Sequence, residues 1–153
     1  LEYFYSDIKD ILPEYKIIVK EHPMDIGRVD YSYLREKYPE IIWIQKWDIW
    51  DYINISDYLI CVNSSIGLQA LSKYKKVLTL WENFYSNNPW VKNISSQEEF
   101  SWKLTELSQQ DLQKQQKEID EYIKIFRDKI FISNGWWQNF NQKTITSICE
   151  RLI

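Results

Sequence analysis

A histidine at the end of an apolar run is the first residue whose chemistry stands out. His22 is the only histidine of the 153 residues, and it follows the apolar run at residues 17–19 and precedes Pro23. Proline ends the run and biases the preceding residue towards an extended conformation. An imidazole fixed there can donate a hydrogen bond to a phosphate, and a neighbouring dianion would favour its protonation. The alternative is an ordinary packed or solvent-exposed histidine.

Two successive serines form the second group of interest. Ser64 and Ser65 follow an apolar run and Asn63, and they lead directly into small and apolar residues. Serine is a favoured helix N-cap, and a helix start presents unpaired N–H groups and the positive end of the dipole. The pair therefore predicts a helix cap or, together with His22, an anion site. Gly67 favours the anion site, because it weakens a helix but lets a ligand approach the backbone.

Strands and helices are expected to alternate in the first part of the chain. Apolar runs bounded by turn residues predict strands at 17–19, 41–44, 58–62 and 77–80, and helices are expected between them at 30–38, 48–54 and 65–74. This spacing predicts an α/β fold with a Rossmann-like parallel sheet flanked by helices. Ligands bind such sheets at the carboxyl ends of the strands. We therefore expect His22 and the two serines to follow strands of one sheet and to meet one anion.

The second part of the chain reads as helical. The alternation is expected to stop after Trp81, and helices are predicted at 96–108, 111–131 and 141–152. We interpret residues 1–153 as a single domain, with an α/β part at 1–95 and a helical tail at 96–153. Because the sequence opens at Leu1 without methionine, we expect it to be a piece of a longer polypeptide.

The composition excludes several classes of partner. The net charge is −3, with acidic and basic residues interspersed, which argues against nucleic acid. No apolar stretch approaches the roughly 20 residues that span a bilayer. The two cysteines, Cys61 and Cys149, lack zinc-type spacing and are interpreted as buried free thiols, so no metal is expected. Five of the eight tryptophans are assigned mainly to packing: Trp43, Trp47, Trp50, Trp136 and Trp137.

Several short motifs together resemble the C-terminal domain of the capsule polysaccharide biosynthesis family. They are Lys20-Glu21-His22-Pro23, the run from Asn63 to Leu71, a lysine-preceded strand at Val77, and Phe84-Tyr85. The resemblance covers about residues 17–85, and the family includes bacterial β-Kdo transferases. It implies the donor-binding half of a GT-B glycosyltransferase, with CMP-Kdo as donor, a retaining transfer and no metal or other cofactor. Because the sequence shows neither a spanning stretch nor a basic-then-apolar leader, we also expect a cytoplasmic protein, with at most peripheral association at the inner face of the inner membrane.

The resemblance also implies roles for individual residues. His22, Ser64 and Ser65 would hold the CMP phosphate, and the loop from Pro23 to Gly27 would flank cytidine. Arg28 is either a contact to the phosphate or the Kdo carboxylate, or a solvated loop residue. Further donor-binding candidates are Lys20, Pro23, Gly27, Asn63, Gly67, Gln69 and Tyr85. At Gln69 the chain departs from the usual Leu-Glu-Ala pattern, which would weaken a hydrogen bond to a sugar hydroxyl.

No catalytic residue is expected within these 153 residues. A nucleophile and base pair cannot be assembled with a single histidine. The resemblance places the catalytic carboxylate and the saccharide or glycolipid acceptor on an N-terminal domain absent from this chain, so the chain alone should bind donor without transferring it. Two alternatives stay open. One is a CDP-alditol glycerophosphotransferase-like domain, although those usually carry Asp-Tyr-Ser-Ser where this chain has Val62-Asn63 before the serines. The other is a non-enzymatic Rossmann scaffold, which Gln69 would allow.

Overall fold

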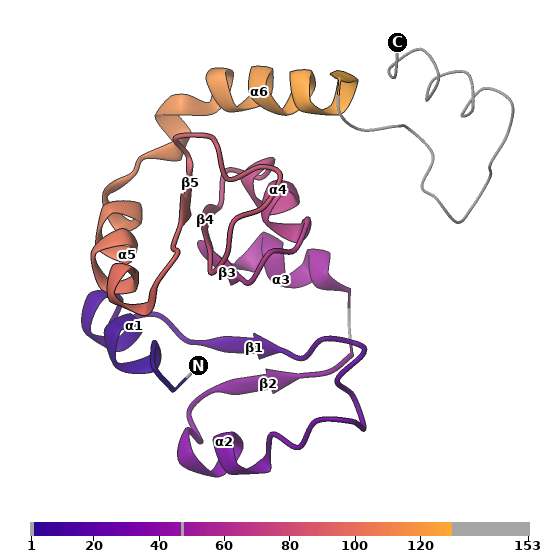
Figure 1. The fold of residues 1–153 in the computed structure, drawn as a ribbon, viewed down its shortest axis with the longest axis vertical. Coiled ribbons are helices and arrows are strands. Elements are labelled where there is room, and N and C mark those ends of the chain that lie inside the picture. Colours follow the sequence, from indigo (N-terminus) through magenta and orange to yellow (C-terminus); the bar gives the residue numbers. More distant parts are fainter. Residues whose placement is uncertain (1, 47, 130–153) are drawn as a thin grey trace, which may run out of the picture. The chain divides into compact units, whose positions relative to one another are not determined.

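The computed structural model describes residues 2–46 and 48–129, which are drawn as coloured ribbon in Figure 1. The chain divides into two compact units, Leu1–Leu112 and Gln113–Ile153, and each is described by itself. The first unit contains, in chain order, α1 (Tyr5–Ile11), β1 (Ile18–Lys20), α2 (Ser32–Lys37), β2 (Ile42–Ile44), α3 (Ile49–Ile55), β3 (Tyr58–Cys61), α4 (Ile66–Leu71), β4 (Lys76–Thr79), β5 (Val91–Asn93), the 3-10 helix η1 (Gln97–Glu99) and α5 (Phe100–Gln109).

Every strand pairing in the described residues is parallel. β1 pairs with β2, with Val19 opposite Trp43, and β4 lies between β3 and β5 in a second sheet. Helices connect the successive strands from β1 to β4, as βαβ units require (Figure 1). The predicted α/β class with parallel strands flanked by helices is thus confirmed, and the four predicted strands are all present.

The expectation of one continuous sheet is wrong. Backbone hydrogen bonds join β1 to β2 and β3 to β4 and β5, but no ladder joins β1 to β3. The two sheets nevertheless share one core. A buried cluster receives Ile17, which precedes β1, and Ile60 from β3. The members of this cluster are Ile8, Leu12, Leu78, Ile94, Phe100, Leu104 and Leu107. Side-chain packing in this cluster, rather than a shared ladder of backbone hydrogen bonds, therefore connects the two sheets.

The alternation of strands and helices does not stop after Trp81, as the sequence had indicated. β5 pairs with β4, with Val91 opposite Val77. Just before β5, the Asn88 side chain accepts hydrogen bonds from the backbone N–H groups of Trp90 and Val91. The strand is only three residues long, and two of them, Lys92 and Asn93, are polar. So short a segment shows no apolar run, which is why the pattern escaped the sequence analysis.

The helix α5 belongs to the α/β unit, whereas the sequence placed residues 96–109 in a helical tail. Phe100, Leu104 and Leu107 follow a helical i, i+4, i+7 spacing and are fully buried in the shared core. Lys76 reinforces this packing, because its Nζ donates to the backbone carbonyl of Ser108 at 2.5 Å. Burial of the Lys76 ammonium group lowers its pKa. α5 therefore helps to fix β4 and the loops that follow the strands.

The second unit is described as far as Lys129. A short 3-10 helix, η2 (Leu112–Gln115), crosses the boundary between the units and leads into α6 (Gln116–Lys129), which confirms the helix predicted over most of 111–131. Ile119, Ile123 and Phe126 recur along α6 at i, i+4 and i+7, which gives one apolar face. The predicted helix at 141–152 lies outside the described residues, as do Trp47, Trp136, Trp137 and Cys149. Among the described helices, none has the length and apolarity to cross a membrane.

Candidate functional site

His22 lies in an exposed turn directly after β1. The backbone N–H of Glu21 still donates to the carbonyl of Ile44 at 3.0 Å, so pairing with β2 reaches the residue before the histidine. The carbonyl of His22 accepts from Asp25 N–H at 2.9 Å, which closes the turn. Within it, Nδ1 of His22 accepts from the backbone N–H of Met24 at 3.2 Å.

This hydrogen bond assigns the tautomer of the imidazole. A ring nitrogen that accepts carries no proton, so the neutral ring of His22 carries its proton on Nε2. Because the side chain is exposed, Nε2–H is a hydrogen-bond donor open to a ligand. Nδ1 is occupied by the Met24 N–H, so Nε2 is the ring nitrogen that a ligand can reach.

The rest of the turn supports His22 through its backbone. Gly27 has a φ of +74°, a conformation that favours glycine, while a Cβ there would meet nothing within 4 Å. The turn therefore explains this glycine without a ligand. Pro23 and Arg28, which also lie in this stretch, are exposed. The Lys20 Nζ donates to the backbone carbonyl of Glu21 at 3.5 Å.

The second candidate loop follows β3 and contains the two serines. Asn63, Ser64 and Ser65 are all exposed. The Ser64 hydroxyl accepts from the backbone N–H of Ile66 at 3.3 Å, and the Ser64 carbonyl accepts from Gly67 N–H at 3.1 Å. Ser65 precedes α4 directly, yet its side chain makes no capping hydrogen bond. Ser64 thus supports the helix start, whereas the Ser65 hydroxyl stays available to a ligand.

Gly67 and Tyr85 form a structural contact beneath this loop. Tyr85 is fully buried, and its hydroxyl donates to the carbonyl of Ser64. A Cβ on Gly67 would overlap the Tyr85 hydroxyl. The close approach that glycine permits is therefore taken by Tyr85, and the expectation that it admits a ligand is not what the geometry shows. Tyr85 supports the serine loop from below, and Gln69 lies half-buried within α4.

The support beneath Ser64 is uncharged. The Cys61 sulfur lies 3.8 Å from the Tyr85 hydroxyl and 4.0 Å from the carbonyl of Ser64. Burial raises the pKa of the Cys61 thiol, and burial likewise raises the pKa of the Tyr85 hydroxyl. Both groups therefore stay protonated and uncharged at neutral pH, and the serine loop rests on neutral side chains.

The structure places both loops at carboxyl ends of parallel strands, but of different sheets. Among residues 2–46 and 48–129, no hydrogen bond or ion pair joins the His22 turn to Ser64 or Ser65. Exposed apolar side chains accompany the loops after β1, β3 and β4: Met24, Ile26, Val29, Val62, Trp81 and Phe84. The strand ends therefore present polar donors among exposed apolar side chains.

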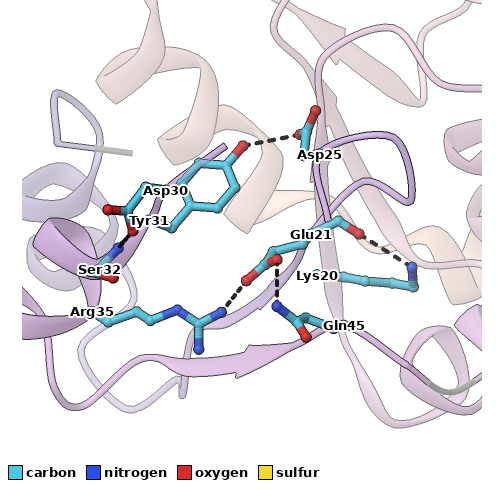
Figure 2. A network of polar contacts seen from close by, with 8 residues as sticks. All are labelled: Lys20, Glu21, Asp25, Asp30, Tyr31, Ser32, Arg35 and Gln45. Atoms are coloured by element: carbon cyan, nitrogen blue, oxygen red, sulfur yellow. Dashed lines mark hydrogen bonds and ion pairs between the residues drawn. The ribbon is translucent and has the colours of Figure 1, made fainter. Parts of the chain in front are cut away.

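Sequence reasoning missed a polar pocket at the ends of β1 and β2. Its centre is Glu21, which is only 5% exposed and which Figure 2 shows between Arg35 and Gln45. The Arg35 guanidinium donates to one carboxylate oxygen, and Gln45 Nε2 donates to the other at 3.0 Å. The pocket has a volume of about 480 Å³ and is lined by Glu21, Gly27, Val29, Asp30, Tyr31, Ser32, Arg35, Trp43 and Gln45.

Aromatic residues complete the wall of this pocket. Tyr31 stacks on Trp43 with ring centroids 5.8 Å apart, and the Arg35 guanidinium lies 5.1 Å from the Trp43 ring centroid. The Tyr31 hydroxyl donates to Asp25 at 3.0 Å, which links the pocket to the His22 turn. The signal that could have found the pocket is a pair of polar residues at strand ends: Gln45 directly follows the predicted strand at 41–44, and Glu21 lies two residues after the one predicted at 17–19.

Comparison with known proteins identifies the family. A family model described as capsule polysaccharide biosynthesis protein matches residues 6–122, which include both loops and the pocket. The chain belongs to the capsule polysaccharide biosynthesis family. Membership of this family indicates a glycosyltransferase-type role in capsule synthesis. No curated protein and no solved structure matches the chain significantly.

The described part of this family member offers no clustered metal ligands. Within residues 2–46 and 48–129, no three His, Cys, Asp or Glu side chains are placed to hold an ion. The acidic side chains of the pocket are engaged elsewhere, since Glu21 binds Arg35 and Asp30 accepts from Ser32 N–H at 2.9 Å. Hydrogen bonding to Ser32 lowers the pKa of Asp30. The pocket carboxylates therefore already accept hydrogen bonds from Arg35 and from the Ser32 N–H.

Proposed function

We propose that this chain is the donor-binding part of a glycosyltransferase that transfers Kdo from CMP-Kdo, with retention, in capsule or surface polysaccharide synthesis. The observation that supports this most directly is the exposed Nε2–H of His22, fixed by the Met24 hydrogen bond at a strand end. The family match supports the capsule role. The donor and the stereochemistry are proposals that rest on the resemblance of the His22-Pro23 and Ser64-Ser65 motifs.

The proposed site binds phosphate through neutral donors first and charges second. His22 Nε2–H and the Ser65 hydroxyl would each donate to a phosphate oxygen. Arg28 and Lys20 are exposed or half-buried near the His22 turn and would add positive charge. Pro23, Gly27 and Asn63 would shape the loops around the nucleotide. No metal is part of this proposal, because the phosphate charge is met by side chains.

The remainder of the enzyme is part of the same proposal. An N-terminal domain would contribute the catalytic carboxylate and would bind the saccharide or glycolipid acceptor. The protein would work in the cytoplasm at the inner face of the bacterial inner membrane. The chain itself would bind donor without turnover. Gly67 and Gln69 would contribute from their positions in α4. Tyr85 would position the serine loop through its hydrogen bond to the Ser64 carbonyl and would not touch the donor.

Calorimetric titration of the chain with CMP, CDP and UMP tests the proposal. CMP should bind with preference over UMP and CDP, and His22→Ala and Ser65→Ala should each weaken binding by about tenfold or more, as expected for hydrogen bonds to a charged group. Ser101→Ala, an exposed serine of α5, is the matched control and should bind CMP like the unmodified chain.

The outcomes separate the alternatives. Preference for CDP over CMP would replace the Kdo proposal with a CDP-alditol transferase. Absence of binding by any of the three nucleotides, in a chain that remains folded by circular dichroism, would contradict donor binding and leave a scaffold. Binding that survives both His22→Ala and Ser65→Ala would place the nucleotide elsewhere in the chain.

A further inference from the structure

We propose that the pocket at the ends of β1 and β2 binds a neutral saccharide, at a site separate from the one proposed for phosphate. The pocket volume of about 480 Å³ lies within the range of small-molecule sites, and would admit one or two sugar rings. It lies at the carboxyl ends of parallel strands, where open α/β folds bind ligands.

His22 directly follows Glu21 in the chain but does not line the pocket. Successive side chains of an extended segment point to opposite faces, and β2 pairing continues as far as Glu21. Glu21 points into the pocket, where Arg35 and Gln45 meet it (Figure 2), while His22 is not among the lining residues. A molecule in this pocket therefore need not contact the His22 donor.

The charges of the wall favour a neutral ligand. Glu21 and Asp30 contribute two carboxylates, and Arg35 contributes the single guanidinium, so the lining residues carry one net negative charge. Arg35 is already paired with Glu21, which leaves no uncompensated cation for a phosphate or a carboxylate. A phosphate would meet net repulsion from this wall.

The hydrogen-bonding groups match sugar hydroxyls. Arg35 is planar with five N–H donors, of which Glu21 engages part, and its side chain is 40% exposed. Gln45 is exposed, with a carbonyl oxygen that can accept and an amide held against Glu21. A hydroxyl both donates and accepts, so neighbouring ring hydroxyls can bridge these fixed donors and acceptors.

The aromatic part of the wall suits the carbon face of a sugar. Tyr31 and Trp43 stack on each other and provide apolar surface beside the polar groups. Trp43 Nε1 is buried and has no hydrogen-bond partner among the described residues, although buried polar groups are normally paired. Trp43, which lines the pocket, thus carries an indole N–H that no described residue satisfies.

Ligand-observed NMR with the 153-residue chain tests the inference. The probes are the methyl glycosides of α-glucose, β-galactose and α-mannose, with cytidine and inorganic phosphate as competing chemistries. At least one glycoside should give saturation transfer and should shift the Trp43 indole resonance, assigned with Trp43→Phe. Gln45→Ala should weaken that glycoside by about fivefold, the loss expected for one neutral hydrogen bond. Lys46→Ala, also exposed but outside the pocket, is the matched control.

A second variant keeps the test decisive if Gln45 contributes little. Glu21→Gln combined with Arg35→Gln removes the charges as a pair, so that no unpaired ion is left in the wall, and should abolish glycoside binding. His22→Ala and Ser65→Ala should bind the glycoside normally, and Gln45→Ala should bind CMP normally, which separates this inference from the nucleotide proposal. The inference is overturned if no glycoside binds, if the double variant binds it unchanged, or if only cytidine or phosphate shifts Trp43.

Discussion

The hydroxyl of Tyr85 donates to the backbone carbonyl of Ser64, 21 residues earlier in the chain. This hydrogen bond joins the loop after β4 to the loop after β3, and it passes directly over Gly67. The motif residues of the serine loop therefore do different work. Ser65 presents a hydroxyl to the surface, while Gly67 and Tyr85 determine the position of the backbone that carries it.

Gly67→Ala should destabilise the chain, although alanine normally stabilises a helix by up to about 1 kcal/mol relative to glycine. The added methyl group would overlap the Tyr85 hydroxyl and contact its ring. Overpacking of this kind costs about 2 kcal/mol, and urea denaturation measures it. The sign of the change distinguishes packing against Tyr85 from a simple helix preference.

Two further variants show whether Tyr85 is the cause. In a Tyr85→Leu background the ring is gone, so Gly67→Ala should cost much less than in the unmodified chain. Gly27→Ala serves as the matched control: it should cost about 1 kcal/mol through its positive φ, equally in both backgrounds. If Gly67→Ala alone is as stable as the parent chain, the proposed overlap between residue 67 and Tyr85 is contradicted.

The stability of the chain should fall as the pH rises past 9.0, the ordinary pKa of a cysteine thiol. Burial raises the pKa values of Cys61 and Tyr85, so both stay protonated in the folded chain while the unfolded chain loses these protons. The folded state then binds more protons, and its free energy of unfolding falls by at most about 1.4 kcal/mol per pH unit for each group. Their contribution is fully present below the ordinary pKa values and is lost above them.

The difference between variants isolates this effect from other titrating groups. Lys76 acts in the opposite sense, because burial lowers its pKa and favours folding as the pH rises towards 10.5. Urea midpoints measured from neutral to alkaline pH should therefore be compared between the parent and Cys61→Ala. A smaller alkaline loss in Cys61→Ala supports the buried thiol, whereas parallel curves would show that Cys61 ionises normally.

Much of the fold could be predicted because burial imposes simple patterns. The runs at Ile41 and Val77 consist mostly of apolar residues, which is typical of strands in a parallel sheet, and they form β2 and β4 close to the predicted bounds. β5 escaped because Val91 is followed by Lys92 and Asn93, and only its pairing with β4 makes it a strand. Short strands depend on tertiary context that no local pattern contains.

The site was predictable to the extent that it is local. His22 and Ser65 are exposed at strand ends, as their positions after apolar runs indicated. The role of Gly67 depends on Tyr85. The pocket depends on Arg35 from α2 and on Glu21 and Gln45, which follow β1 and β2. Such contacts join residues 14 or more positions apart, and spacing along the sequence does not reveal them.

Arg35→Ala should destabilise the chain by about 2 kcal/mol, because it leaves the Glu21 carboxylate buried with only Gln45 as partner. Unpaired buried charges cost 3–5 kcal/mol in fully buried pairs, and the value is lower here since Arg35 is 40% exposed. Glu21→Gln with Arg35→Ala should restore most of the stability. Lys37→Ala is the matched control, because its partner Glu2 is exposed, and it should change the urea midpoint little. If Lys37→Ala and Arg35→Ala lower the free energy of unfolding by similar amounts, the stabilising role of the buried pair is contradicted.

His22 should be replaceable by glutamine but not by asparagine if Nε2–H is the donor that binds CMP. The glutamine amide extends about as far as Nε2, whereas the asparagine amide extends only about as far as Nδ1, which faces the Met24 N–H. We therefore expect His22→Gln to bind CMP within about fivefold of the parent, and His22→Asn to bind as weakly as His22→Ala. Calorimetry with the three variants decides this, and equal CMP binding by His22→Gln and His22→Asn would show that Nε2–H is not the donor.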